Sequence, residues 1–234
     1  MPELSIVVPV YNEAATIKEL VASVRESGLQ HYELIVVDDY STDGTRELIS
    51  RLESEEASGS LKVRMHSKNQ GKGAALRTGL AEAKGRFVVF QDADLEYDPK
   101  DLVKMLELLR SGEAEVVYGS RMLHPDIRQE SPVWHRLINR GLTEFSNFFT
   151  GLRLTDMETC YKMFPTECLK RFGLEEDRFG VEPELTAKLA ALGMKFAEIP
   201  ISYRRRSYEA GKKIGFSDGV RAIYVICKYG MVSL

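Results

Sequence analysis

Phe87-Val88-Val89-Phe90-Gln91-Asp92-Ala93-Asp94 is the stretch that decides the fold, because an apolar run leads directly into two carboxylates one residue apart. Side chains alternate between the faces of a strand, so both acids point the same way if strand geometry persists to its carboxyl end. Open α/β sheets bind ligands at that edge, where a hard divalent cation takes carboxylate and phosphate oxygens. The pair therefore predicts a metal-bridged diphosphate site. The alternative, an acidic surface loop, is the reading we accept for Asp98, which can cap a helix before Pro99.

The chain around this stretch alternates strand and helix patterns. Strands are expected at residues 4–10, 34–37, 61–65, 87–90 and 116–118, and helices at 14–27, 43–56, 73–83 and 99–109. Such alternation indicates βαβ units. The first half therefore predicts an α/β fold with a single Rossmann-like, mostly parallel sheet flanked by helices.

The second half is less regular. A helix is expected over 133–149 and another over 183–192, with strands near 161–164 and 195–201 and a last helix that sets Phe216, Val220, Ile223, Tyr224 and Cys227 on one side. Trp134 and the phenylalanines Phe145, Phe148 and Phe149 are expected in the core. The alternative is a groove for a lipid or a membrane surface, with the basic Arg136 and Arg140 beside it.

Bulk properties bound the class of protein. A chain of 234 residues with 44% hydrophobic content fits one large domain. A net charge of -3 and a pI near 5.9 argue against general nucleic-acid binding. Three cysteines without C-x-x-C spacing favour a reduced, cytoplasmic compartment. No apolar run approaches the roughly 18 residues of a membrane span, so neither a signal peptide nor a span is expected.

Two common nucleotide-binding loops are missing. The first strand is followed by Pro9-Val10-Tyr11-Asn12-Glu13, and Gly71-Lys72-Gly73 comes later, so neither G-x-G-x-x-G nor G-x-x-x-x-G-K-[ST] is present. Asp39, at the tip of the second strand, is placed to accept hydrogen bonds from a base or ribose. Lys72 can approach a phosphate, although glycines needed for close helix packing explain its motif equally well.

Five ordered motifs carry a family resemblance: residues 6–13 (IVVPVYNE), VVDDYSTDGT, NQGKGAALRTG, QDADLEYDP and Tyr118-Gly119-Ser120-Arg121. Together they resemble family-2 glycosyltransferases of the GT-A fold, and within them dolichol-phosphate mannose synthases and bacterial polyprenyl-phosphate glycosyltransferases. The similarity continues through DMETCYKMF, RFGVEPELTAKLA and SYEAGKKIGFSDGVRA, and covers nearly the whole chain. The chain departs from the family at Tyr40, where a small residue is usual, and in lacking the carboxyl-terminal membrane helices of many relatives.

The resemblance implies a role for each matching residue. Pro9, Tyr11, Glu13 and Asp39 would surround the nucleoside, and Asp92 and Asp94 would hold Mg²⁺ or Mn²⁺ against the diphosphate. Glu96 would add a metal contact, and Arg121 would meet the acceptor phosphate. The full set expected to bind the nucleotide sugar is Pro9, Tyr11, Glu13, Asp39, Lys72, Asp92, Ala93 and Asp94.

The nature of the acceptor decides which further residues matter. A sugar hydroxyl needs a general base, and Asp156 is the best-placed acid, with Glu158, Glu182 and Glu184 as weaker candidates; a purely structural hydrogen bond remains the alternative for Asp156. A lipid monophosphate is already mostly dianionic at neutral pH and needs an arginine fork to position it. Candidates for that contact are Arg121, Arg136, Arg140, Arg204, Arg206 and Lys212, against the alternative of a solvated basic face.

These observations predict a single glycosyltransferase domain over 1–234, in which 1–121 bind nucleotide sugar and metal and 122–234 bind the acceptor. The resemblance implies a metal-dependent transfer of a hexose to a polyprenyl phosphate, with GDP-mannose favoured over UDP-glucose as donor. It also implies inversion, since no covalent nucleophile is evident, with Asp94, Arg121 and Asp156 as catalytic residues. The enzyme is expected at the cytoplasmic face of a membrane, as a peripheral protein that binds no nucleic acid. The alternatives are a transferase with a saccharide hydroxyl acceptor and a non-catalytic nucleotide-sugar-binding module.

Overall fold

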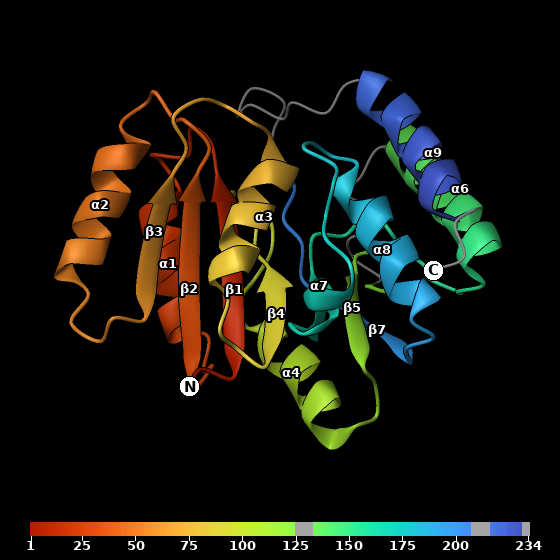
Figure 1. The fold of residues 1–234 in the computed structure, drawn as a ribbon, viewed down its shortest axis with the longest axis horizontal. Coiled ribbons are helices and arrows are strands. Elements are labelled where there is room, and N and C mark those ends of the chain that lie inside the picture. Colours follow the sequence, from red (N-terminus) through yellow and green to blue (C-terminus); the bar gives the residue numbers. More distant parts are fainter. Residues whose placement is uncertain (125–132, 207–215, 231–234) are drawn as a thin grey trace.

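The computed structural model describes residues 1–124, 133–206 and 216–230 and shows a seven-stranded sheet with helices on both faces (Figure 1). The strand order is β3-β2-β1-β4-β6-β5-β7. All pairings are parallel except those of β6, which runs antiparallel to both β4 and β5. The strands are β1 (Leu4–Val10), β2 (Tyr32–Asp38), β3 (Leu61–Met65), β4 (Phe87–Phe90), β5 (Val116–Ser120), β6 (Lys162–Pro165) and β7 (Phe196–Pro200). The predicted α/β class is confirmed.

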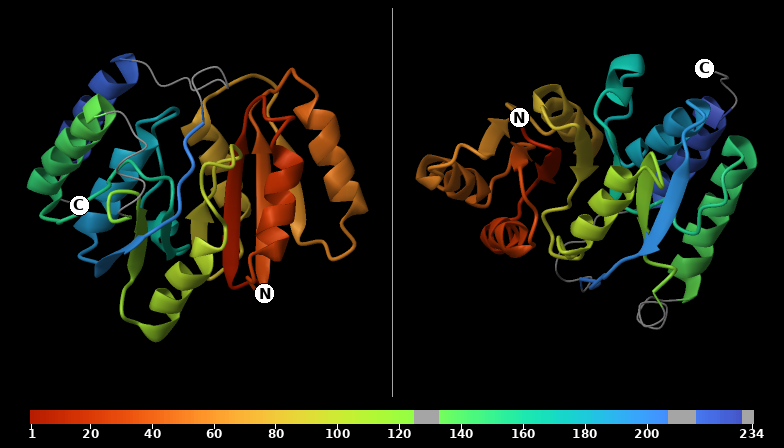
Figure 2. Two further views of the ribbon diagram at one scale, coloured as in Figure 1. Left: turned by 180° about the vertical axis from the view of Figure 1, so that it is seen from behind. Right: turned by 90° about the horizontal axis from the view of Figure 1, so that it is seen from below.

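The helices form layers around this sheet. They are α1 (Ile17–Glu26), α2 (Thr45–Glu55), α3 (Lys72–Glu82), α4 (Asp101–Ser111), α6 (Val133–Thr150), α7 (Cys168–Arg171), α8 (Val181–Ala191) and α9 (Phe216–Gly230). α3 lies against β1 and β2 on one face and α1 covers the other face (Figure 1, Figure 2). α6, α8 and α9 pack against one another beside the β5–β7 end of the sheet. Most predicted elements recur within a few residues of their expected bounds, whereas the short α7 was not predicted.

Close packing of α3 on the sheet depends on a glycine. A Cβ atom on Gly79 would lie 2.3 Å from Cγ1 of Val7 in β1. The helix therefore rests almost directly on the strand, and its first residue, Lys72, is held at the carboxyl ends of the parallel strands. Ion-binding groups at that edge are consequently fixed by the buried core of the sheet.

The helix α6 is oriented against the expectation from its sequence. Trp134 and Phe148, predicted in the core, are 54% and 81% exposed, while Thr143 and Ser146 are buried. The inner face is polar because its side chains hydrogen-bond the segment before β6: Thr143 Oγ1 accepts the amide of Met157 at 3.1 Å. The prediction is wrong for Trp134 and Phe148. Phe145 and Phe149 are partly buried against the core, as predicted.

Candidate active site

The acidic residues predicted to bind the donor meet at the carboxyl edge of the parallel strands. Glu13 follows β1, Asp39 follows β2, and Asp92 and Asp94 follow β4. The segment after β7 reaches the same edge, where Arg206 joins two of these acids. Its Nη2 lies 3.1 Å from Oδ2 of Asp94 and 2.8 Å from Oε1 of Glu13, and its Nη1 lies 3.0 Å from Oε2 of Glu13.

The Asp94 carboxylate is surrounded by more negative than positive charge, even with Arg206 as its partner. Burial, the neighbouring Asp92 and then Glu96 raise the pKa of Asp94 to about 6. A cation placed here would relieve that repulsion. The turn is shaped by Leu95, a non-glycine residue at φ +60°, a conformation that is strained for L-residues and concentrates at functional sites.

Glu96, the third residue expected to contact a metal, accepts hydrogen bonds from the segment after β7. Its Oε2 accepts the hydroxyl of Tyr203 at 2.5 Å and its Oε1 accepts the amide of Arg206 at 2.9 Å. It therefore fastens the segment after β7 to the loop after β4. Among the described residues no group of three His, Cys, Asp or Glu side chains converges as a ready metal site. Asp92 and Asp94 nonetheless fit Mg²⁺ or Mn²⁺, because such ions are bound by one or two carboxylates plus waters and substrate phosphates.

Lys72 lies between the first acid of the pair and a residue of α8. Its Nζ is 2.9 Å from Oδ1 of Asp92 and 2.9 Å from Oε1 of Glu182. Burial opposes the charge on Lys72, yet Asp92 and Glu182 raise its pKa well above the usual value. The lysine is thus a fixed cation beside the predicted diphosphate position.

The glycines flanking Lys72 explain how it gets there. A Cβ on Gly73 would lie 2.0 Å from the carbonyl oxygen of Glu176, and one on Gly71 would lie 2.3 Å from that of Asp177. The loop before α8 therefore presses against the start of α3, and Ala74 N donates to Asp177 O at 3.2 Å. The close-packing reading of the motif is confirmed, and that packing brings Lys72 to the edge of the site, where its contact with a phosphate stays a prediction.

The Asp39 carboxylate accepts hydrogen bonds that hold the loop between β3 and α3. Its Oδ1 accepts the amide of Gln70 at 2.8 Å, its Oδ2 accepts the amide of Gly71 at 2.7 Å, and Nδ1 of His66 lies 2.7 Å from Oδ1. It is 3% exposed. His66 was not singled out from the sequence, although it follows β3 as Asp39 follows β2, and neighbouring parallel strand ends share one edge.

The remaining donor candidates line the same edge. Pro9 is the second-last paired residue of β1, opposite Val37. Tyr11 is exposed just beyond this strand, and Ala93 is buried between the two acids. Tyr40 sits at φ +69°, a conformation that favours glycine. That explains why a small residue is usual at its position.

Arg121 and Asp156 form the centre of the predicted acceptor side. Arg121 Nε lies 2.7 Å from Asp156 Oδ2, Nη2 lies 2.8 Å from Oδ1, and the Arg121 amide also donates to Oδ2 at 3.0 Å. Asn139 of α6 adds a donor at 2.9 Å. Burial opposes ionisation of Asp156, but Arg121 prevails and lowers its pKa. The guanidinium lies 5.3 Å from the centre of the Tyr203 ring, so the segment after β7 borders both halves of the site.

The other basic candidates divide by position. Arg136 and Arg140 lie on α6, which also carries Asn139, and Arg204 is exposed after β7. Arg206 lies with the donor carboxylates and not in the pair formed by Arg121 and Asp156. Lys212 lies outside the described residues.

Four ionisable residues complete the neighbourhood, of which Glu158 is half-buried and the others are buried. Burial and then Glu182 raise the pKa of Glu158 to about 7, and burial lowers that of Lys162 to about 8. Lys162 donates to the carbonyls of Met157 and Thr159, which holds the loop after Asp156. From the sequence Glu182 was only a weaker candidate base, and its link to Lys72 emerges from the packing of the loop before α8 on the start of α3. Glu184 is structural: it accepts the amides of Glu175 and Glu176.

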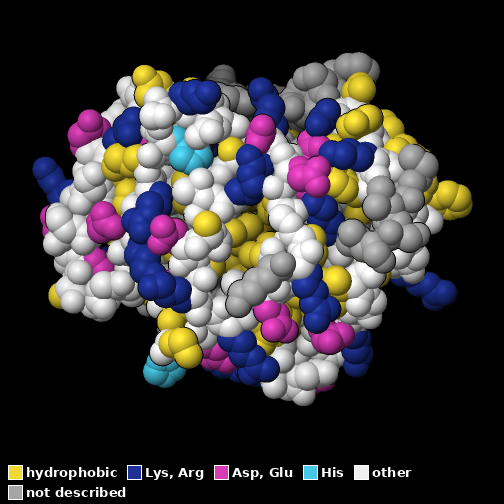
Figure 3. All heavy atoms as spheres, viewed as in Figure 1, with side chains coloured by type: hydrophobic (Ala, Val, Ile, Leu, Met, Phe, Trp, Pro, Cys, Tyr) yellow, Lys and Arg dark blue, Asp and Glu magenta, His cyan; other side chains and the backbone are white. Residues whose placement is uncertain are grey.

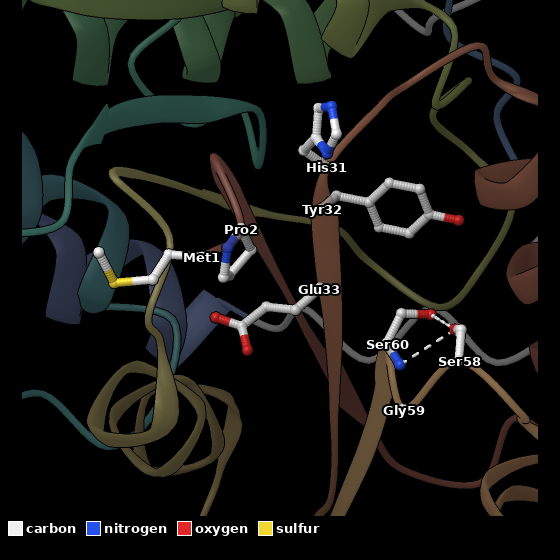
Figure 4. Close-up of a pocket in the computed structure, with 8 residues that line it drawn as sticks. All are labelled: Met1, Pro2, His31, Tyr32, Glu33, Ser58, Gly59 and Ser60. Carbon is white, nitrogen blue, oxygen red and sulfur yellow. Dashed lines mark hydrogen bonds between the residues drawn. The ribbon is translucent and has the colours of Figure 1, made fainter.

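One surface hollow in the described part of the chain lies away from this site. It has a volume of about 310 Å³ and is lined by Met1, Pro2, His31, Tyr32, Glu33, Ser58, Gly59 and Ser60 (Figure 4). These residues stand at the amino ends of β1, β2 and β3, whereas Asp92 and Asp94 stand at the carboxyl edge. The site is therefore identified by its converging charges.

Comparison with known proteins agrees with this geometry. Residues 5–173 match the model of the family described as glycosyl transferase family 2. Glycosyltransferase AglJ of Haloferax volcanii is 32% identical over 86% of this chain and 63% of its own length. The undecaprenyl-phosphate mannosyltransferase of Micrococcus luteus is 26% identical over 97% of this chain and 93% of its own.

Solved structures with low sequence identity share the fold. Glucosyl-3-phosphoglycerate synthase from Mycobacterium tuberculosis, crystallised with Mg²⁺ and UDP, superposes with a TM-score of 0.71 at 23% identity, over 97% of this chain and 79% of that one. TarS 1-349 of S. aureus with UDP-GlcNAc gives 0.65 at 19% identity, over 98% and 66%. The sheet and its helices are thus those of the GT-A fold. AglJ and TarS both extend well beyond the length that this chain matches.

Proposed function

Because this chain is a member of glycosyl transferase family 2 and hence a glycosyltransferase, we propose that it moves a hexose from a nucleoside-diphosphate sugar to a polyprenyl phosphate. The observation that carries this choice of acceptor is the Arg121–Asp156 pair. Asp156, the acid best placed to serve as a base, is fully buried with both oxygens bound by an arginine. An acceptor that is already ionised needs no base, only a cation that positions it.

On the donor side, charge neutralisation is the main requirement. Asp92 and Asp94 would hold Mg²⁺ or Mn²⁺, which when bound stabilises negative charge on the departing diphosphate. Lys72 and Arg206 border these two acids at 2.9 and 3.1 Å. In this proposal both cations turn toward the diphosphate oxygens as the donor enters, so the acids and the phosphates exchange partners. Glu13, Tyr11 and Pro9 flank the nucleoside.

On the acceptor side, Arg121 presents the part of its guanidinium not used by Asp156. A phosphate monoester is mostly dianionic at neutral pH, and it would attack the anomeric carbon from the side opposite the diphosphate. That direction inverts the configuration and needs no covalent nucleophile. Arg136, Arg140, Arg204 and Lys212 remain proposed contacts for the same phosphate.

A relative supports the lipid acceptor. The undecaprenyl-phosphate mannosyltransferase of Micrococcus luteus aligns with nearly all of this chain. By that analogy GDP-mannose is the favoured donor and UDP-glucose the second choice, since solved neighbours of the same fold were crystallised with UDP.

We also infer that the enzyme reaches its lipid by docking on a membrane surface through α6 and α9. Trp134, Leu137, Ile138 and Phe148 of α6 and Val220, Ile223 and Tyr224 of α9 are exposed; we call these seven residues the α6–α9 surface. Figure 3 shows hydrophobic side chains along the edge of the molecule that α9 forms. Arg140 and Arg221 are exposed on the same two helices, and apolar residues flanked by basic ones favour an anionic lipid surface. No helix in the described ranges is long and apolar enough to cross a bilayer.

A transfer assay with sorted products tests the main proposal. The protein would be given radiolabelled GDP-mannose or UDP-glucose with Mn²⁺, and either a polyprenyl phosphate or a free saccharide, beside Asp94→Ala and Arg121→Ala. Metal-dependent label in the organic extract, lost in both variants, is expected. Label on the saccharide alone would reject the lipid acceptor.

A second candidate has one specific observation in its favour. Glu158, near Arg121, has a pKa of about 7, which suits a general base acting on a saccharide hydroxyl. In that case Glu158→Gln would abolish transfer to the saccharide, whereas in the main proposal, in which Glu158 is not a base, the maximal rate of transfer to a phosphate acceptor is retained once the donor is saturating. Donor binding without any transfer would leave the non-catalytic binding module.

A further inference from the structure

Glu182 has a feature that the reaction outlined above does not use. One carboxylate oxygen, Oε1, pairs with Lys72 at 2.9 Å, but the other, Oε2, is buried and has no hydrogen-bond partner among the residues that the structure describes. The residue is 7% exposed. Buried carboxylate oxygens nearly always accept a hydrogen bond, because leaving one without a donor is costly. The missing donor is therefore a clue to a ligand.

The position of Glu182 indicates which ligand. Asp92, Lys72 and Glu182 form a continuous line of contacts, each step 2.9 Å long. If the diphosphate lies at Asp92 and Asp94, the next group of the donor is the sugar, which must also face Arg121 and its acceptor. Glu182 lies one residue beyond the diphosphate position along this line.

A second acid supports the same assignment. Glu158 also has a buried oxygen, Oε1, for which the described part of the chain offers no hydrogen-bond partner. The pKa of Glu158, raised by burial and then by Glu182, is also affected by Arg121. Two acids with unused acceptor oxygens between the donor acids and the acceptor arginine match the chemistry of a hexose, which offers several hydroxyl donors.

The backbone around Glu182 is held firmly enough for selective binding. Glu182 belongs to the first turn of α8, and the preceding loop is fixed on Gly71 and Gly73 by backbone contacts. Arg221 adds an ion pair to Glu176 in that loop at 2.9 Å. A fixed acceptor discriminates between hydroxyl patterns far better than a mobile one.

We propose that Glu182 recognises the donor sugar, accepting a hydrogen bond from one of its hydroxyl groups through Oε2. This inference rests on the proposed donor site but not on the identity of the acceptor. Lys72 orients the carboxylate by holding its other oxygen. Glu182 is thus a specificity-determining residue, and Lys72 positions it.

The test compares the affinities of a nucleotide with and without its sugar. Calorimetric titration with Mn²⁺ present would measure binding of GDP, GDP-mannose, UDP and UDP-glucose to the wild type, Glu182→Gln and Glu182→Ala. Losing a charge-assisted hydrogen bond weakens binding of the sugar form about tenfold or more. Because Lys72 borders both groups, the variants can also alter diphosphate binding, so the quantity to follow is the ratio of the two affinities for each base.

Glu184→Gln is the matched control. Glu184 lies in the same helical turn but binds backbone amides and Lys188, so its variant should melt at a lower temperature and keep the wild-type ratio. Donors with a deoxy sugar give a sharper test. Removing the hydroxyl that Glu182 accepts should weaken donor binding to the wild type about tenfold and leave donor binding to Glu182→Ala unchanged.

The outcomes separate the two proposals. An unchanged ratio in both Glu182 variants overturns this inference even if lipid transfer is confirmed. A reduced ratio without any lipid product supports it and rejects the proposed acceptor. Failure of the wild type to bind any of the four nucleotides rejects the donor site and this inference with it.

Discussion

Arg121 and Asp156 are joined by two parallel hydrogen bonds of 2.7 and 2.8 Å, so each residue is the main partner of the other. A carboxylate held in this way is a poor proton acceptor, since the guanidinium keeps its pKa low. The pair therefore acts as one unit, in which Nε and Nη2 of Arg121 serve Asp156 and Nη1 makes no hydrogen bond to it.

Replacing Asp156 should damage the fold as well as the reaction. Asp156→Asn leaves the Arg121 charge buried without its partner, which typically costs about 3 to 5 kcal/mol. The melting temperature should fall by roughly 6 to 20 °C, as followed by circular dichroism. A variant that melts like the wild type but has lost all transfer would instead identify Asp156 as the base of a hydroxyl-acceptor enzyme.

Arg206 and Arg204 should differ in the substrate that they affect. Arg206 contacts Glu13 and Asp94, so Arg206→Ala should weaken binding of GDP or UDP about tenfold or more. Arg204 is exposed, and Arg204→Ala should leave nucleotide affinity unchanged. Titration calorimetry on both variants measures this contrast. Equal losses would mean that the two arginines act on the same phosphate.

Glu158 should make stability depend on pH. Burial and Glu182 raise its pKa from 4.5 to about 7. The folded protein then holds a proton that the unfolded chain has released, so stability falls as pH rises from about 4.5 through 7 and levels off above. Glu158→Gln removes this decline. Its free energy of unfolding, measured with urea, should equal that of the wild type near pH 5 and exceed it by roughly 1 to 3 kcal/mol at pH 8. Parallel pH curves for the two proteins would contradict the assignment.

Two glycines should respond to alanine in opposite directions. Gly73→Ala forces a methyl group to within 2.0 Å of the Glu176 carbonyl, and such overpacking costs about 1 to 3 kcal/mol or more. Gly141 lies in α6 with open space around it, so Gly141→Ala should stabilise by up to about 1 kcal/mol. Thermal melts of both variants decide. A neutral Gly73→Ala would mean that the loop before α8 moves away easily.

The α6–α9 surface should control membrane binding. Leu137 and Phe148 are 64% and 81% exposed, so Leu137→Glu and Phe148→Glu should fold normally. Each loses about 1.5 to 3 kcal/mol of apolar burial, which corresponds to a roughly 10- to 100-fold weaker partition onto vesicles of anionic phospholipid. Met65→Glu, at an exposed apolar site on the far edge strand β3, is the control and should not change flotation with vesicles. Binding that survives both α6 changes would reject this surface.

The sequence predicted the structure best where the hydrophobic pattern of a strand and the residue types that follow it point to the same element. Asp92 and Asp94 were placed correctly because an apolar strand leads into them, and the parallel layout followed from the alternation of elements. The orientation of α6 was missed because its helical period shows which residues share a face but not which face is buried. The buried face is chosen by hydrogen bonds to the segment before β6: Asn139 donates to Asp156, and Thr143 accepts from the amide of Met157.

Other features depend on contacts that no local pattern encodes. Glu182 meets Lys72 only because α8 packs on the start of α3, about a hundred residues earlier in the chain. Arg204 and Arg206 lie in the same short run of arginines. Only the course of the backbone after β7 determines that Arg206 is the one that contacts Glu13. The sequence pattern therefore placed Asp92 and Asp94 after their strand, and it assigned Lys72 to the nucleotide sugar and Arg206 to the acceptor phosphate, but it did not show that these two cations contact the acids.

The antiparallel strand β6 has a consequence for how the chain can fold. It lies between β4 and β5, so β5 pairs only with strands that are synthesised more than 40 residues later. Pairings of such sequence separation form slowly. A nascent chain ending near residue 121 would carry every predicted donor ligand up to Asp94 but would lack the strand that joins β5 to the sheet. Cleavage between the two halves should therefore yield fragments that recover a native sheet only when combined.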